Sequence, residues 1–181
     1  MKDVWKKFQE NDLTHSTAHH LMAIYDLLKT KGYARTIDIA NYLKITRGSV
    51  AITLNKLKKR NLITEDENKF YRLSETGEEY INEILSKRNI LEKFLTDVLN
   101  LPPQTAAIDA CKIEHLISKE MAERLLSFMG YFLSDRKEVR RFESGFREFI
   151  YRCQSAENCE VCETECFYRG KPEKYITGSD E

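Results

Sequence analysis

The chain has 181 residues, of which 41% are hydrophobic and 32% charged, a composition typical of a soluble globular protein with one or two modest cores. No apolar run approaches the roughly 20 residues that span a bilayer, and the N-terminus lacks the apolar segment of a signal peptide, so we expect a cytoplasmic protein. The net charge is zero, yet residues 1–75 hold 14 Lys and Arg against 9 Asp and Glu. This N-terminal part is therefore the candidate for contacting a polyanion.

Three helices are predicted in this basic part of the chain. Apolar residues at helical spacing predict a helix over residues 16–31, and Gly32 is a helix-ending signal. A short helix is expected over 36–43, followed by a turn and a third helix over 47–60. Two short helices joined by a turn of three residues are typical of a helix-turn-helix, whose second helix enters the major groove of DNA.

The third predicted helix carries the side chains expected of a recognition helix. Between Lys44 and Ile63 there are six basic residues and no acidic ones. Positive charges suit phosphates, and short polar side chains near the start of the helix can reach base edges. We therefore predict binding to double-stranded DNA. The residues expected to make the contacts are Arg47, Ser49, Thr53, Asn55, Lys56, Lys58, Lys59 and Arg60.

A β-hairpin is predicted directly after the helix-turn-helix. Two β-prone runs, residues 62–64 and 70–73, flank a polar turn. A hairpin in this position is the wing of a winged-helix fold. The sequence therefore predicts a winged-helix DNA-binding domain within residues 1–75.

The following segment is predicted to be entirely helical, which makes the fold class mainly α. Helices are expected over 76–100, 104–117 and 119–132, and their apolar surface exceeds what this small segment can bury alone. We therefore predict a dimerisation domain over residues 76–133. A homodimer also suits the helix-turn-helix, because paired recognition helices read two half-sites of a palindromic operator about one DNA turn apart.

A possible metal site lies in the predicted helix over 104–117. Cys111, Glu114 and His115 stand at positions i, i+3 and i+4, which places a thiol, a carboxylate and an imidazole on one helix face. The spacing alone fits equally well a small core cysteine beside a surface Glu–His pair. A fourth ligand has to come from elsewhere. The other histidines of the chain are His15, His19 and His20.

A second metal site is predicted at the C-terminus, where a helix over 135–152 leads into a cysteine-rich loop in the predicted domain 134–181. Its ligands would be Cys153, Cys159, Cys162 and Cys166. In a reducing compartment clustered thiols indicate a metal, and disulfides are the less favoured alternative. Four-cysteine zinc sites usually use two distant Cys-x2-Cys pairs, whereas one pair flanked closely by single cysteines favours a [4Fe-4S] cluster, with Zn2+ as the alternative. The loop resembles the cluster loop of the endonuclease III and adenine glycosylase family, although the intervals differ.

Segments at 31–35, 73–77 and 91–95, and above all 109–115, resemble the diphtheria-toxin-repressor and manganese-repressor (DtxR/MntR) family. The resemblance implies a homodimeric winged-helix repressor that binds DNA when loaded with Fe(II) or Mn(II), with the metal bridging the first helix and the dimerisation helix. It places Cys111, Glu114 and His115 in the primary metal site, and His19 at the position of the first-helix ligand. Such a set favours Fe2+ or another divalent transition metal such as Co(II) or Zn(II) over Mn(II).

The family's ancillary metal site is only partly matched. Its carboxylate corresponds to Glu92, but its two histidines fall on Arg88 and Ala107. Because arginine cannot ligate a metal, we expect no second ion there and an ion pair between Arg88 and Glu92 instead.

The sequence as a whole predicts an iron-responsive transcriptional repressor. We predict no enzymatic activity, because nothing in the chain offers a convincing nucleophile or acid–base pair. The alternative is a regulator in which the C-terminal cluster senses iron supply or oxidants and the helix site is vestigial, or one in which the loop holds a structural zinc.

Overall fold

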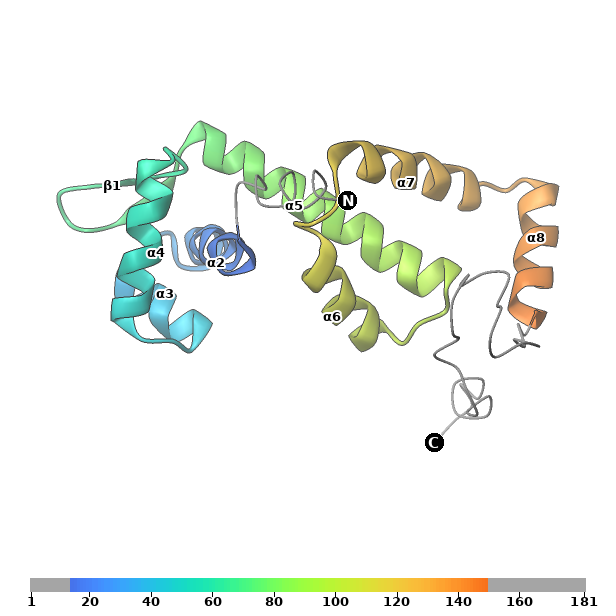
Figure 1. Ribbon diagram of the computed structural model, residues 1–181, viewed down its shortest axis with the longest axis horizontal. Helices are drawn as coiled ribbons and strands as arrows, with labels where there is room; N and C mark the ends of the chain where they lie inside the picture. Colours follow the sequence, from blue (N-terminus) through green and yellow to red (C-terminus); the bar gives the residue numbers. More distant parts are fainter. Residues whose placement is uncertain (1–13, 150–181) are drawn as a thin grey trace, which may run out of the picture. The chain divides into compact units, whose positions relative to one another are not determined.

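The computed structural model describes residues 14–149, which form seven α-helices, one π-helical turn and a two-stranded sheet (Figure 1). The chain divides into two compact units, one ending at Leu133 and one beginning at Ser134. The mainly helical fold class is confirmed. The four cysteines of the C-terminal loop lie outside the described residues.

Helix α2 (His15–Lys31) is the first element of the larger unit. The Thr14 side chain accepts a hydrogen bond from the backbone N–H of Thr17, which caps the start of the helix. Gly32 ends it in the left-handed conformation, with φ at 79°, and donates its N–H to the carbonyl of Leu28. These local signals explain why the predicted helix agrees with the structure to within one residue.

Helices α3 (Thr36–Leu43) and α4 (Arg47–Lys59) form the helix-turn-helix. The Thr46 hydroxyl caps α4 by accepting from the backbone N–H of Ser49. Asp38 on α3 is buried, and burial by itself raises the pKa of its carboxyl. The hydrogen bond and charge of Arg35, with the charge of Lys31, outweigh this effect and hold the pKa of Asp38 below its ordinary value.

The wing consists of strands β1 (Ile63–Glu65) and β2 (Tyr71–Leu73), which pair antiparallel with Ile63 opposite Leu73. The backbone N–H of Tyr71 donates to the carbonyl of Ala34 at 2.8 Å and so ties the wing to the loop before α3. One hydrophobic core runs beneath α2, α3, α4 and the wing. These elements complete the winged helix that the sequence predicts.

Helix α5 (Glu75–Lys93) leads from the wing to the helical part of the same unit. Its Gly77 allows α5 to approach the residue before β1 closely, because a Cβ there would lie 2.0 Å from the carbonyl oxygen of Leu62. The predicted helix over 76–100 is interrupted by a π-helical segment, η1 (Phe94–Val98). Inside η1, the Thr96 hydroxyl donates to the carbonyl of Glu92, an interaction that bends helices.

Helices α6 (Pro103–Ile113) and α7 (Lys119–Phe132) both pack against α5. Ala106 and Ala110 are fully buried, and such small side chains allow α6 to approach its neighbours closely. The prediction that α6 continues to residue 117 was wrong, because the chain turns after Ile113, whose carbonyl accepts from the N–H groups of Leu116 and Ile117.

The second unit contains helix α8 (Lys137–Glu148), which falls within the predicted range 135–152. Val139 is its buried residue, whereas Phe142 and Phe146 stack on each other with ring centroids 5.9 Å apart and remain more than one-third exposed. No helix in residues 14–149 combines the length and apolarity needed to cross a membrane.

Candidate metal centre and DNA-contacting surface

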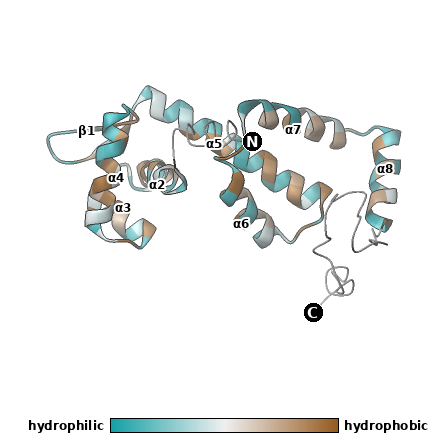
Figure 2. Cartoon of the chain, in the orientation of Figure 1, coloured by the Kyte–Doolittle hydropathy of each residue, from teal (hydrophilic) through white to brown (hydrophobic). Residues whose placement is uncertain are grey.

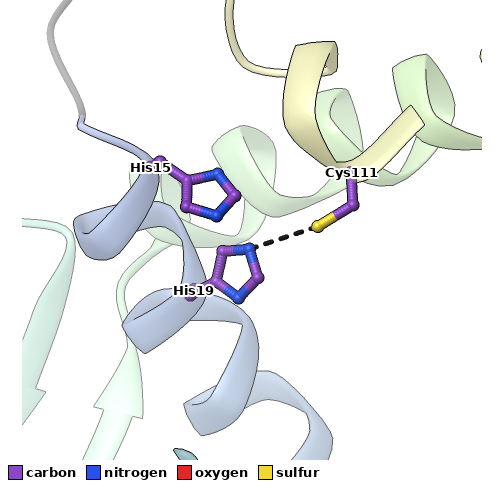
Figure 3. Close-up of side chains that lie close together, drawn as sticks. All are labelled: His15, His19 and Cys111. Carbon is purple, nitrogen blue, oxygen red and sulfur yellow. Dashed lines mark hydrogen bonds between the residues drawn. The ribbon is translucent and has the colours of Figure 1, made fainter. Parts of the chain in front are cut away.

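Two helices far apart in the sequence bring a thiol and two imidazoles together (Figure 3). His15 and His19 lie one turn apart on α2, and Cys111 faces them from α6. Nε2 of His19 is 3.3 Å from Sγ of Cys111, and one ligand atom from each of the three residues lies within 4.8 Å of the others. The donor set suits a transition metal ion.

The sequence left open which N-terminal histidine would join Cys111. The structure brings both His15 and His19 to the thiol. His20 is buried elsewhere on the helix, where its Nδ1 lies 2.6 Å from the carbonyl oxygen of Ser16. His15 and His19 share a face because residues four apart in a helix lie one above the other. The four-residue spacing of His15 and His19 in the sequence therefore indicated that both could reach the same site.

Burial sets the protonation of this cluster. The pKa of His19 is lowered by burial first, and then by the charges of His15, Arg88 and His115. The neutral imidazole that results is the form that carries a lone pair for a metal. The pKa of the Cys111 thiol is raised by burial, against the opposing effect of Arg88. A metal that binds Cys111 must therefore displace a proton, which makes affinity increase with pH.

Glu114 follows the last turn of α6 and is completely buried. Both of its carboxylate oxygens accept hydrogen bonds from Arg88 on α5, from Nε at 2.5 Å and from an Nη at 2.7 Å. The predicted pairing of Arg88 with Glu92 was therefore wrong. The fully buried Glu114 carboxylate requires a counter-ion more strongly than the partly exposed Glu92 does. The packing of α6 against α5 places Glu114 beside the Arg88 guanidinium.

Arg88 also contacts sulfur atoms on both neighbouring helices. The same Nη lies 3.4 Å from Sδ of Met22 on α2 and 3.7 Å from Sγ of Cys111 on α6. Burial alone would lower the pKa of Arg88, but the hydrogen bond and charge of Glu114 raise it above its ordinary value. A permanent cation thus stands beside the cluster, a feature that the sequence analysis missed.

His115 completes the neighbourhood of the cluster. Its ring centroid lies 4.8 Å from that of His15, and its pKa is lowered by burial and then by the His15 charge. Its Nδ1 is buried without a hydrogen-bond partner among residues 14–149. An unpaired buried nitrogen is costly unless another group satisfies it, so its position fits a ligand or a group that supports one.

Helix α4 presents most of the predicted DNA-contacting residues to solvent. Thr53 is partly buried and donates its hydroxyl hydrogen to the carbonyl of Ser49, and Lys58 forms an ion pair with Glu65 in the wing. Ile52 is 63% exposed in the middle of this helix, and the sequence analysis did not single it out. The six predicted residues that are exposed are Arg47, Ser49, Asn55, Lys56, Lys59 and Arg60.

A winged helix joined to a helical region, with a thiol–imidazole cluster between α2 and α6, defines a DNA-binding protein that carries a candidate metal centre. The N-terminal DNA-binding domain of the iron dependent repressors matches residues 12–69, and the metal binding and dimerisation domain of the same group matches residues 74–141. The chain belongs to this iron-dependent repressor (DtxR/MntR) family.

Individual relatives agree with this assignment. An uncharacterised HTH-type transcriptional regulator of Methanocaldococcus jannaschii is 31% identical over 121 residues, which are 66% of this chain and 97% of the relative. The iron-dependent repressor IdeR of Mycobacterium leprae is 27% identical over 66% of this chain and 52% of its own length, so the chain spans about half of that relative. The transcriptional regulator MntR of Oceanobacillus iheyensis is 26% identical over 75% of this chain and 91% of its own.

Solved structures give the same fold. The crystal structure of T. acidophilum IdeR matches with a TM-score of 0.54 and 29% identity, over 62% of this chain and 53% of that chain. The structure of the manganese regulator SloR matches with a TM-score of 0.57 and 25% identity, over 64% and 54% respectively. These relatives are regulators, which agrees with the prediction of a protein that is not an enzyme.

Proposed function

We propose that this protein is a homodimeric transcriptional repressor whose binding to operator DNA depends on a divalent metal ion, with iron as the ion that it monitors. The observation that carries the proposal is the 3.3 Å approach of His19 to Cys111. His19 lies on α2, which packs against α3 and α4 and shares their core, whereas Cys111 belongs to the helical part. The cluster therefore joins the DNA-reading part to the helical part.

The residues of the cluster fit a transition metal ion, since imidazole nitrogen and thiolate sulfur are among its preferred ligands. A bound ion would supply bonds to ligands on both helices at once. His19 would hold α2, and through the shared core α4, in a fixed relation to α6. Binding energy that is available in only one arrangement of these helices favours that arrangement, which is how the cluster would control DNA affinity. The ligand set predicted from sequence adds Glu114 and His115 to His19 and Cys111.

The DNA contacts are proposed for α4. Its exposed lysines and arginines suit the phosphate backbone, and Ser49 and Asn55 suit base edges. The exposed Ile52 side chain suits the methyl group of thymine. Lys58 is already paired with Glu65, so we expect it to contribute less to binding than its exposed neighbours. In a dimer two such helices would read a palindromic operator.

The dimer interface is proposed for the helical part, where apolar and polar residues are interleaved along α7 (Figure 2). A concentration of exposed large apolar side chains is typical of interaction sites in soluble proteins. The dimerisation domain that matches residues 74–141 supports the same assignment. The large apolar side chains exposed in this region are Leu99, Ile108, Ile113, Leu116, Met121, Leu126, Phe128 and Leu133.

The test compares the metal response of DNA binding between the native chain and Cys111→Ala. A DNA duplex that the native chain binds would first be selected from a random pool, and this duplex would then serve as the operator in the assay. We expect Cys111→Ala to remain dimeric and to lose the increase in affinity that Fe(II) or Co(II) produces in the native chain. Lys112→Ala is the matched control, since Lys112 is exposed and pairs only with Asp109 among the described residues. An undiminished metal response in Cys111→Ala would refute the proposal.

We also propose a second metal site in the C-terminal loop, formed by Cys153, Cys159, Cys162 and Cys166 and holding a [4Fe-4S] cluster. The support is the compact spacing of four thiols within fourteen residues. Anaerobically purified protein should absorb broadly near 400 nm and contain about four irons and four sulfides per chain. A colourless protein with about one zinc per chain in the loop would instead identify the loop as a structural zinc site.

The alternative regulator, in which the loop is the sensor, predicts a different mutational pattern. Replacing Cys159 and Cys162 together would then abolish regulation while the helix site is intact. In the function proposed here, the same double variant keeps the metal response that depends on Cys111.

A further inference from the structure

We propose that the helix site of this chain binds its ion through His15, His19 and Cys111, while Glu114 is withheld as the ion-pair partner of Arg88. The site would therefore select a divalent ion that accepts nitrogen and sulfur ligands, such as Fe(II), Co(II) or Zn(II), over Mn(II). This inference rests on the metal-dependent function proposed above and specifies which residues hold the metal.

The spacing of the three donors fits a tetrahedral ion. With Zn–N bonds of about 2.0 Å and Zn–S bonds of about 2.3 Å, nitrogen and sulfur ligands lie roughly 3.5 Å apart. The observed separation of His19 Nε2 and Cys111 Sγ is 3.3 Å, and His15 brings a further donor within 4.8 Å of both. His15 is exposed at the start of α2, where its side chain can adjust without disturbing the core.

Glu114 is close in sequence to Cys111 but its oxygens are already in use. Both accept from Arg88, and the carboxylate has no exposed surface. An ion that recruited Glu114 would have to displace a guanidinium that cannot lose its proton, and would leave two cations side by side in a buried place. Leaving the pair intact avoids the displacement and keeps the Glu114 carboxylate as the counter-ion of Arg88. Arg88 then acts on the cluster through its charge, with an Nη 3.7 Å from the Cys111 sulfur.

His115 is a further candidate donor, because its ring lies beside that of His15 and its Nδ1 has no partner in the described part of the chain. It lies outside the group of His15, His19 and Cys111, whose donor atoms come within 4.8 Å of one another. A set of imidazoles and one thiolate without a carboxylate is softer than the four-ligand set that the sequence predicts. Softer ligands favour Fe(II), Co(II) and Zn(II), whereas carboxylate and water favour Mn(II).

The experiment is a Co(II) titration of the full-length chain in which the four C-terminal cysteines are replaced by serine. The chain contains five cysteines, so any thiolate-to-Co(II) absorption band in this protein must come from Cys111. Single variants His15→Ala, His19→Ala, Glu114→Gln and His20→Ala are then titrated in the same background. His20→Ala is the matched control, because this histidine lies on the same helix but outside the cluster.

We expect His15→Ala and His19→Ala each to weaken Co(II) binding by about 100-fold or more, and His20→Ala to leave it unchanged. Glu114→Gln, which keeps an oxygen for Arg88, should retain the thiolate band and change affinity by no more than about threefold. If Glu114→Gln fails to fold by circular dichroism, Arg88→Met/Glu114→Gln removes both charges and should also retain the band.

The ligand set would be overturned if a folded variant lacking the Glu114 carboxylate lost Co(II) binding as severely as His19→Ala, or if His15→Ala bound Co(II) normally. DNA is absent from this assay. A chain with the expected Co(II) behaviour but no metal-dependent DNA binding would refute the proposed function and leave the ligand set intact, so the two failures are distinguishable.

Discussion

Arg88→Met tests the central electrostatic feature of the structure, the buried ion pair with Glu114. Methionine preserves much of the aliphatic volume, so the change removes the charge without opening a large cavity. Glu114 is fully buried and receives two short hydrogen bonds from Arg88, which the variant deletes. Removing one partner of a buried ion pair typically costs about 3–5 kcal/mol. Because Arg88 itself is 21% exposed, we expect a loss near the lower end, about 3 kcal/mol in the free energy of unfolding.

The assay is urea unfolding of the metal-free protein followed by circular dichroism. Protein concentration must be equal in all samples, because the stability of a dimer depends on it. With a slope of about 2 kcal/mol per molar urea, the expected loss lowers the midpoint by about 1.5 M. The double variant Arg88→Met/Glu114→Gln should recover most of the loss, since no buried carboxylate is then left without a partner.

Arg140→Met provides the control, because Arg140 pairs with Asp135 where both side chains are largely exposed. Exposed pairs contribute little, so we expect a change within about 0.5 kcal/mol. The reasoning would be refuted if Arg88→Met cost less than about 1 kcal/mol, or if the double variant were no more stable than the single one.

Three further predictions concern the winged helix and its junction with α5. Gly77→Ala should lower the free energy of unfolding by about 1–3 kcal/mol in thermal unfolding, because the new methyl group would meet a backbone carbonyl. Gly130→Ala is the control and should not destabilise the protein, because the space around its Cβ is open. Because the pKa of Asp38 is lowered in the folded state, its carboxylate stabilises the protein fully above the ordinary Asp pKa, and this contribution is lost as the pH falls from there through the lowered folded-state pKa. Asp38→Asn should therefore cost up to about 1 kcal/mol at pH 7 and less as the pH falls through the lowered pKa of Asp38, and a cost that does not change with pH would contradict the assignment. Lys59→Ala should weaken DNA binding and reduce the slope of log affinity against log salt concentration by about one. Lys58→Ala removes a charge that is already paired with Glu65 in the wing, so it should have a smaller effect on both. Equal effects of the two variants would show that the Lys58–Glu65 pair does not persist on DNA.

The sequence by itself determined the local elements of this protein. Helices α2, α3, α4 and α7 follow from apolar spacing and from capping residues such as Thr46, Ser118 and Gly32, and the wing follows from two β-prone runs around a polar turn. These signals involve residues within about four positions of one another, so they can be recognised without knowing how the rest of the chain folds. The same range covers the spacing of Cys111, Glu114 and His115.

Only the tertiary structure decided how these residues are used. His19 and Cys111 are 92 residues apart, and Arg88 and Glu114 are 26 apart, so their contacts depend on how α2, α5 and α6 pack. The resemblance to the family's ancillary metal site had suggested Glu92 as the partner of Arg88. Glu114, buried at the end of α6, is the partner instead, because a carboxylate removed from water requires a counter-ion more strongly than one that water still reaches.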